Sequence, residues 1–208
     1  MTSPLGESEV RIKIVLHGPP SVGKASVLRN LGAKLGAAGD ARLTELRTDD
    51  DRVLALDVVV PGLPPIEGRS ARIQICTAPG EVKRLTTWRR LVAGADALIF
   101  LADLRPERAV ANADSLKDLR ADLAAEGVVE AATPVVVAFR KQDGGAPSEF
   151  RAPFGGAGLP AFEIDVDDGS GALAVVTAAV RLLYEGVGQG LGDVAARRIA
   201  ALSQSRPL

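Results

Sequence analysis

The sequence has little of several residue types that usually carry chemistry. Its 208 residues include one cysteine, one histidine and one tryptophan, and aromatic residues make up 3%. A single cysteine excludes an internal disulfide, and no zinc cluster or Ser-His-Asp set is recognisable. We interpret Cys76 as a small core residue and His17 as a side chain at the end of a strand.

An excess of charge of one sign is also absent, as are long apolar runs. The net charge is −1, so nothing points to nucleic acid or to an anionic membrane as a partner. No apolar run reaches membrane-spanning length, and the first ten residues are too polar and acidic for a signal peptide. We therefore expect a cytoplasmic protein with no nucleic-acid partner and no direct membrane insertion.

What is present is enough apolar material for one α/β domain, since hydrophobic residues make up 47%. Apolar runs alternate with helical patterns, which is typical of a mostly parallel sheet with crossover helices. The link between the second and third strands is rich in turn residues, so these two strands could form a hairpin. Strands are expected at 11–17, 52–60, 71–76, 97–103, 133–139 and 161–165, and helices at 24–35, 83–94, 108–126 and 171–186.

Residues 17–26, HGPPSVGKAS, match a phosphate-binding loop up to its last step. Gly18, Gly23 and Lys24 fit the pattern G-x-x-x-x-G-K-[ST], between a predicted strand and a predicted helix. Glycines let backbone N–H groups turn toward phosphate oxygens, and the start of a helix adds positive charge. The prolines at positions 19 and 20 have no N–H. The expected cradle is therefore Ser21, Val22, Gly23, Lys24, Ala25 and Ser26.

Ala25 stands where the pattern requires a hydroxyl. A methyl group cannot coordinate magnesium, which demands oxygen ligands in octahedral geometry. Ser26 is turned about a hundred degrees around the helix and is not expected to substitute. We therefore predict no metal ligand in the chain. A loop that no longer holds a ligand is the alternative.

Further motifs follow in a recognisable order: TDDDR (48–52), TAPGE (77–81), FRKQD (139–143) and DDGSG (167–171). In order and spacing they resemble the MglA family of bacterial Ras-like small GTPases, which act in gliding motility and cell polarity. The TxPG form is fairly specific to that family. The resemblance runs from about Val10 to Gly186. It implies a P-loop NTPase fold with a Ras-like G domain at 11–188, after a disordered tail at 1–10 and before a helical extension at 189–208.

The sequence departs from the family at four working positions. The resemblance implies a magnesium-binding threonine at Ala25, a second threonine hydroxyl at Asp50, a water-orienting glutamine at Glu81 and a base-reading asparagine at Arg140. An ionised Glu81 would repel a γ-phosphate and could not donate a hydrogen bond. We interpret Arg140 as a solvated side chain, although an arginine can also donate to guanine O6 and N7.

Other positions still match the family. The resemblance implies that the Gly80 N–H senses a γ-phosphate, and that Lys141 and Asp143 hold the guanine of GTP or GDP. Glu81 and Arg52 are the candidate catalytic residues. We expect both to contribute little without the metal ligand and the glutamine.

The expected function is a guanine-nucleotide-binding switch in polarity or motility, with very slow or absent hydrolysis. The resemblance implies a regulatory partner of the roadblock type and a downstream effector. A nucleotide-free pseudo-GTPase that serves as an interaction scaffold is the alternative, so the sequence leaves enzymatic activity open. Trp88 is either an anchor for a partner or a core residue.

Overall fold

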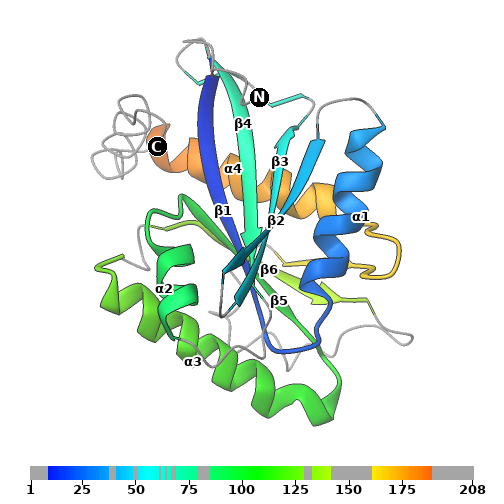
Figure 1. Ribbon diagram of the computed structural model, residues 1–208, viewed down its shortest axis with the longest axis vertical. Helices are drawn as coiled ribbons and strands as arrows, with labels where there is room; N and C mark the ends of the chain where they lie inside the picture. The colour runs from blue at the N-terminus through cyan, green and yellow to red at the C-terminus, as the bar shows by residue number, and fades with distance from the viewer. Residues whose placement is uncertain are drawn as a thin grey trace.

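The computed structural model describes residues 9–37, 41–48, 51–60, 62–63, 65–66, 69–78, 85–128, 133–141 and 161–188. Seven strands of this part form one sheet in the order β2-β3-β4-β1-β5-β6-β7 (Figure 1). The strands are β1 (Glu9–His17), β2 (Ala41–Thr48), β3 (Asp51–Val59), β4 (Ser70–Thr77), β5 (Ala97–Ala102), β6 (Val135–Arg140) and β7 (Ala161–Ile164).

Most of the sheet is parallel. Strand β1 pairs in parallel with β4 and β5, and β6 pairs in parallel with β5 and β7. Strand β3 is antiparallel to both of its neighbours, β2 and β4. The predicted α/β class is therefore confirmed, and β3 and β4 form the antiparallel pair that their turn-rich link suggested.

Helices cover both faces of the sheet and enclose two cores (Figure 1). On one face lie α1 (Lys24–Gly36) and α4 (Ala172–Gly188), and on the other lie α2 (Leu85–Val92) and α3 (Ala109–Ala125), preceded by a short 3-10 helix, η1 (Pro106–Arg108). Along β1, Ile14 and Leu16 join the first core, whereas Val15 joins the second. This burial on both faces explains why the central strands are nearly continuous apolar runs.

Two features at the ends and edge of the sheet differ from the sequence expectation. Strand β1 begins at Glu9, so Glu9 and Val10 pair with β4 instead of belonging to the tail, and Glu9 forms an ion pair with Arg72 at 3.1 Å. Strand β2 was not expected. It lies at the sheet edge, where Leu43 and Leu46 are 40% and 56% exposed, so its apolar pattern is weak. The predicted extension at 189–208 lies outside the described residues.

The parallel strands bring distant parts of the chain to one edge. Strand β1 lies between β4 and β5. Strands β2, β3 and β4 follow it in the chain and lie on one side of it in the sheet, and β5, β6 and β7 lie on the other side. Ligands of open α/β sheets bind at such a switch point, beyond the carboxyl ends of the strands. The strands that end at this edge finish at His17, Thr77, Ala102, Arg140 and Ile164.

Candidate functional site

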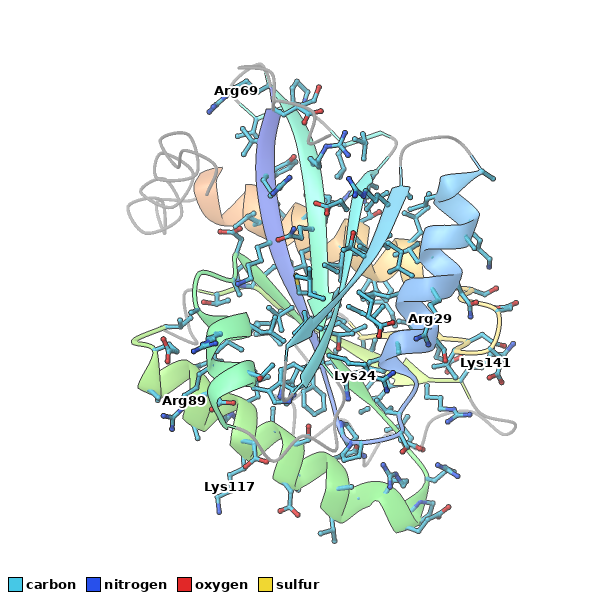
Figure 2. The ribbon with its side chains drawn as sticks, in the orientation of Figure 1. Lys24, Arg29, Arg69, Arg89, Lys117 and Lys141 are labelled. Atoms are coloured by element: carbon cyan, nitrogen blue, oxygen red, sulfur yellow. The ribbon has the colours of Figure 1, made fainter. Side chains whose placement is uncertain are left out.

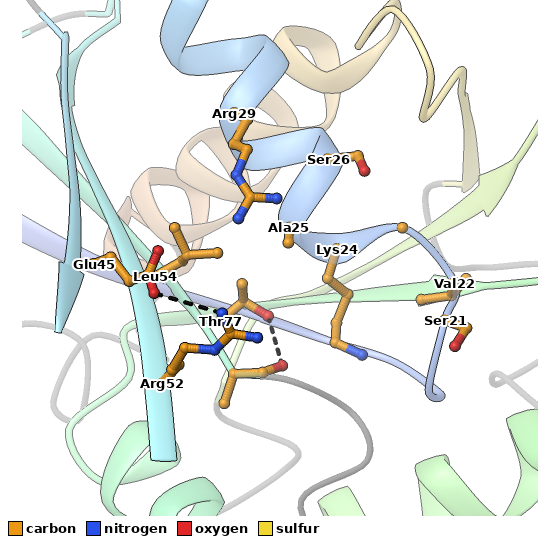
Figure 3. A pocket seen from close by; sticks show the side chains of 12 residues that line it. Ser21, Val22, Lys24, Ala25, Ser26, Arg29, Glu45, Arg52, Leu54 and Thr77 are labelled. Carbon is orange, nitrogen blue, oxygen red and sulfur yellow. Dashed lines mark hydrogen bonds and ion pairs between the residues drawn. The ribbon is translucent and has the colours of Figure 1, made fainter. Parts of the chain in front are cut away.

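A cleft of about 420 Å³ opens at this edge, beside the first turn of α1 (Figure 3). Its volume lies within the range usual for small-molecule sites. The phosphate-loop pattern, the β2–β3 hairpin and the end of β4 all contribute to its wall. The lining residues are Ser21, Val22, Gly23, Lys24, Ala25, Ser26, Arg29, Glu45, Arg52, Leu54, Thr77 and Ala78.

Two positions of the loop require glycine, because neighbouring atoms lie too close to the backbone there to leave room for a side chain. A Cβ on Gly18 would lie 2.2 Å from the Leu101 carbonyl oxygen, and one on Gly23 would lie 2.9 Å from Val166 Cβ. Gly23 also has a φ of 104°, a conformation that side chains disfavour. Ser21 has a φ of 60°, which is uncommon for a non-glycine residue. The loop therefore follows a path that only this placement of glycines allows.

Lys24 is buried inside the loop, with 4% of its surface exposed. Its ammonium donates to the carbonyl oxygens of Gly18 at 2.6 Å and Pro19 at 2.9 Å. The Trp88 ring centroid lies 5.9 Å from the Lys24 Nζ. Burial, together with the charge of Arg108, lowers the pKa of Lys24 to about 8. The ammonium is thus held where an anion in the loop would be a better partner than two neutral carbonyls.

A polar network at the end of β5 supports the loop. The Asp103 carboxylate is fully buried and accepts hydrogen bonds from the Arg105 guanidinium, the shortest at 2.6 Å. Burial acts to raise the pKa of Asp103, but these bonds outweigh it and hold the pKa below its usual value. The Asn112 amide bonds the Asp103 carbonyl at 2.6 Å, and Arg108 donates to the Pro20 carbonyl. Arg108, where η1 ends and α3 begins, therefore joins this region to the loop.

His17 lies beneath the loop in the second core. Its ring centroid is 4.3 Å from that of Trp88 and 5.9 Å from that of Phe100, and Nδ1 is 3.4 Å from Ser115 Oγ. Burial, and then the nearby Lys24 charge, lowers the pKa of His17 to about 3, so the ring is neutral at pH 7. Trp88 is only 7% exposed. Its burial favours the core interpretation over the partner anchor.

The described side chains around Ala25 do not fit a magnesium ion. Ala25 presents a methyl group to the cleft, and the Ser26 hydroxyl leaves α1 on another side (Figure 3). Thr77 Oγ1 already donates to the Leu16 carbonyl at 2.7 Å. Within the described ranges, no group of three or more His, Cys, Asp or Glu residues is placed to hold a metal.

Cationic side chains surround this part of the cleft. Arg29 lies on the side of α1 that faces the β2–β3 hairpin, whereas Lys24 at the start of the helix extends into the loop (Figure 2 and Figure 3). Arg52 of β3 lies opposite, with its Nη1 3.8 Å from Glu45 Oε1. Arg29 and Glu45 were not predicted from the sequence. For Arg29 a signal existed, because it lies four residues after Ala25 and so shares its helix face. Glu45 required knowledge of β2.

The predicted base-binding end is described only in part. Lys141 follows β6, donates its N–H to the Ile164 carbonyl and lies 3.8 Å from the Asp165 carboxylate. The Asn30 amide of α1 donates to the carbonyls of Val166 and Asp167 and so ties the segment after β7 to the helix. The predicted residues Asp50, Gly80, Glu81 and Asp143 lie outside the described residues.

The class of the protein follows from its fold together with its similarity to a known protein. The structure is a mixed α/β protein with a seven-stranded sheet, consistent with a Ras-like G domain. No family model matches the chain. The chain is similar to the mutual gliding-motility protein MglA of Myxococcus xanthus (strain DK1622), with 29% identity over 185 residues, which are 88% of this chain and 95% of that protein. This similarity supports membership of the MglA family as a divergent member. In the described part, no helix combines the length and apolar character needed to cross a membrane.

Proposed function

We propose that the chain is a small GTPase of the MglA type that binds a guanine nucleotide at the cleft and acts as a regulatory switch. Lys24 is the observation that carries this proposal. A buried ammonium with a lowered pKa is an unfavourable group to keep in a loop that serves the fold alone. It becomes favourable once a phosphate enters and accepts its hydrogen bonds. The helix start beside it adds partial positive charge.

Hydrolysis is proposed to be very slow or absent. Phosphoryl transfer depends on positioning and on neutralising charge, for which this class of enzyme uses a metal ion and a residue that orients water. Ala25 offers no metal ligand, and the sequence places Glu81 where the glutamine is expected. Arg52 lines the cleft and is therefore positioned to contact a phosphate. It is also paired with Glu45. Alone, it does not replace the metal and the glutamine.

The biological setting is proposed from the relative. MglA of M. xanthus is named for gliding motility, and a role in motility or polarity is proposed for this chain. A roadblock-type regulator and a downstream effector are the proposed partners. Guanine is the proposed base, because Lys141 at the end of β6 matches the base-reading motif of the family.

A nucleotide-free interaction scaffold is the second candidate. The observation in its favour is that the Lys24 ammonium already has two carbonyl partners within its own loop. The same loop could therefore persist with no ligand. The two candidates differ in whether any nucleotide binds.

Calorimetric titration with GTP, GDP and ATP, each with and without magnesium, tests the proposal. We expect GTP and GDP to bind and ATP not to bind, and phosphate release in the GTP samples to remain close to the uncatalysed level. Lys24→Ala should weaken GDP binding by at least about tenfold, because it removes a hydrogen bond from a charged donor.

The contrary outcomes are separable. If no nucleotide binds at millimolar concentration, the scaffold candidate is correct. If GDP binds and Lys24→Ala leaves its affinity unchanged, the ligand occupies a site other than this loop. Rapid release of phosphate by the unaltered chain would contradict the proposed loss of hydrolysis.

A further inference from the structure

Among the described lining residues, cationic side chains outnumber carboxylates near Ala25, where the metal ligand of the family is missing. Three cationic side chains, Lys24, Arg29 and Arg52, line it, and Glu45 is the one carboxylate among the described lining residues. A cleft with this balance attracts anions and repels a divalent cation. The position that lacks the hydroxyl, Ala25, therefore lies among more cationic than anionic side chains in the described lining.

Arg29 is the residue that the helix brings to this position. It lies four residues after Ala25, which places both side chains on one face of α1. Its guanidinium extends from the helix between Ala25 and Leu54, into the space above Lys24 (Figure 3). Arg29 is exposed, and neither a hydrogen bond nor an ion pair joins it to another residue in the described part of the chain. It can therefore turn toward a ligand without breaking a contact within the protein.

Arg52 and Glu45 form the opposite wall. Their side chains are 62% and 31% exposed and lie 3.8 Å apart, so the pair is a weak one at the surface. A phosphate in the cleft competes with Glu45 for Arg52. Guanidinium groups are well suited to bind phosphate, because their planar array of N–H donors matches two phosphate oxygens at once.

We propose that Arg29 takes the place of magnesium in this cleft, so that the protein binds its nucleotide as a metal-free polyphosphate. The inference rests on the proposed function and deepens it, since it names the form of the ligand and the residue that selects it. Arg29 approaches the phosphoryl oxygens from the α1 side, Lys24 binds them inside the loop, and Arg52 approaches from the hairpin. A nucleotide without its metal carries more negative charge than its magnesium complex and suits three cations better.

GDP titrations in EDTA and in magnesium test this inference. The unaltered chain should bind GDP in EDTA at least as tightly as in magnesium. Arg29→Met, which keeps the length of the aliphatic stem, should weaken binding in EDTA by at least about tenfold. Arg29→Lys should recover part of that loss. Lys34→Met is the matched control, because Lys34 is exposed on the same helix but does not line the cleft. It should change the affinity by less than about twofold.

A second variant tests the charge balance from the other side. Glu45→Gln removes the carboxylate that competes for Arg52 and should tighten GDP binding in EDTA by about threefold or more. If GDP binds but Arg29→Met matches the unaltered chain, or if EDTA weakens binding tenfold, the assignment of Arg29 is wrong while the proposed function stands. If no variant binds GDP under either condition, the proposed function and this inference both fail.

Discussion

At the scale of single residues, the cleft combines glycines that the loop path requires with a lysine whose charge the loop destabilises. Gly18 and Gly23 permit the close approach of the backbone to Leu101 and Val166. Lys24 gains two carbonyl partners there but loses contact with water, so the pKa of its ammonium falls to about 8. Such a group responds strongly to an anion, because a bound phosphate stabilises its protonated form.

The lowered pKa predicts proton uptake when nucleotide binds. Free Lys24 is partly deprotonated above pH 8, whereas the complex keeps it protonated, so the complex binds more protons than the free protein. The affinity for GDP is therefore highest well below pH 8 and falls as the pH rises through 8. At pH 8.5 a substantial fraction of a proton should be taken up per GDP bound. Calorimetry in buffers of different ionisation enthalpy measures this number.

The control for proton uptake is a measurement at pH 6.5, where Lys24 is protonated in both states and contributes no uptake. The nucleotide itself titrates in this range, so free GDP is titrated separately and its protons are subtracted. Equal uptake at pH 6.5 and pH 8.5 after this correction would show that Lys24 does not change its protonation when GDP binds.

At the scale of elements, α2 packs onto the end of β1 through a neutral histidine. His17 lies between Trp88 of α2 and Phe100 of β5, and Ser115 of α3 lies 3.4 Å from its Nδ1. A charge on this ring would be buried in the second core beside Lys24. The pKa of His17 is therefore about 3 in the folded protein, against an ordinary value near 6.5.

This contact predicts a defined sensitivity to acid. Between pH 6.5 and pH 3 the unfolded chain binds a proton at His17 that the folded protein does not, so folding stability falls as the pH falls. The contribution of His17 to this slope approaches about 1.4 kcal/mol per pH unit. The free energy of unfolding of His17→Gln, from urea titrations between pH 4 and pH 6.5, should depend less on pH by about that amount. Parallel curves for the two proteins would show that His17 is protonated in the fold.

The elements also show which features the sequence could predict. Strands β1, β5 and β6 and helices α1 and α4 were predicted, because burial on one or both faces gives each a clear apolar pattern. Helix α3 was also predicted, although its buried residues include Asn112, Ser115 and Asp122. Strand β2 was missed because it lies at the sheet edge and alternates charged residues with half-exposed leucines. Because β2 was not predicted, Glu45 and the wall of the cleft formed by the β2–β3 hairpin were not predicted either. The burial of His17 depends on Trp88 and Ser115, which are distant in the sequence and meet only in the folded sheet.

At the scale of the whole molecule, the loop lies where the two cores meet. Val22, inside the loop, packs in the core beneath α1 and α4, whereas His17, which precedes the loop, lies in the core beneath α2 and α3. A ligand held by this loop therefore stabilises elements on both faces of the sheet. Binding and global unfolding should be linked, because a chain whose two cores have come apart no longer presents the site.

This linkage predicts how much GDP raises the melting temperature. At a concentration one hundred times the dissociation constant, GDP should stabilise the fold by about 2.7 kcal/mol. For a chain of this size that corresponds to about 5–10 °C. Lys24→Ala, whose affinity is at least about tenfold weaker, should show about half of this rise or less at the same GDP concentration, and EDTA should leave the rise in the unaltered chain intact. A melting temperature that stays constant while calorimetry shows saturation would mean that the site survives unfolding of the sheet. That result would contradict a site built from both faces of the sheet and would place GDP on a locally folded segment.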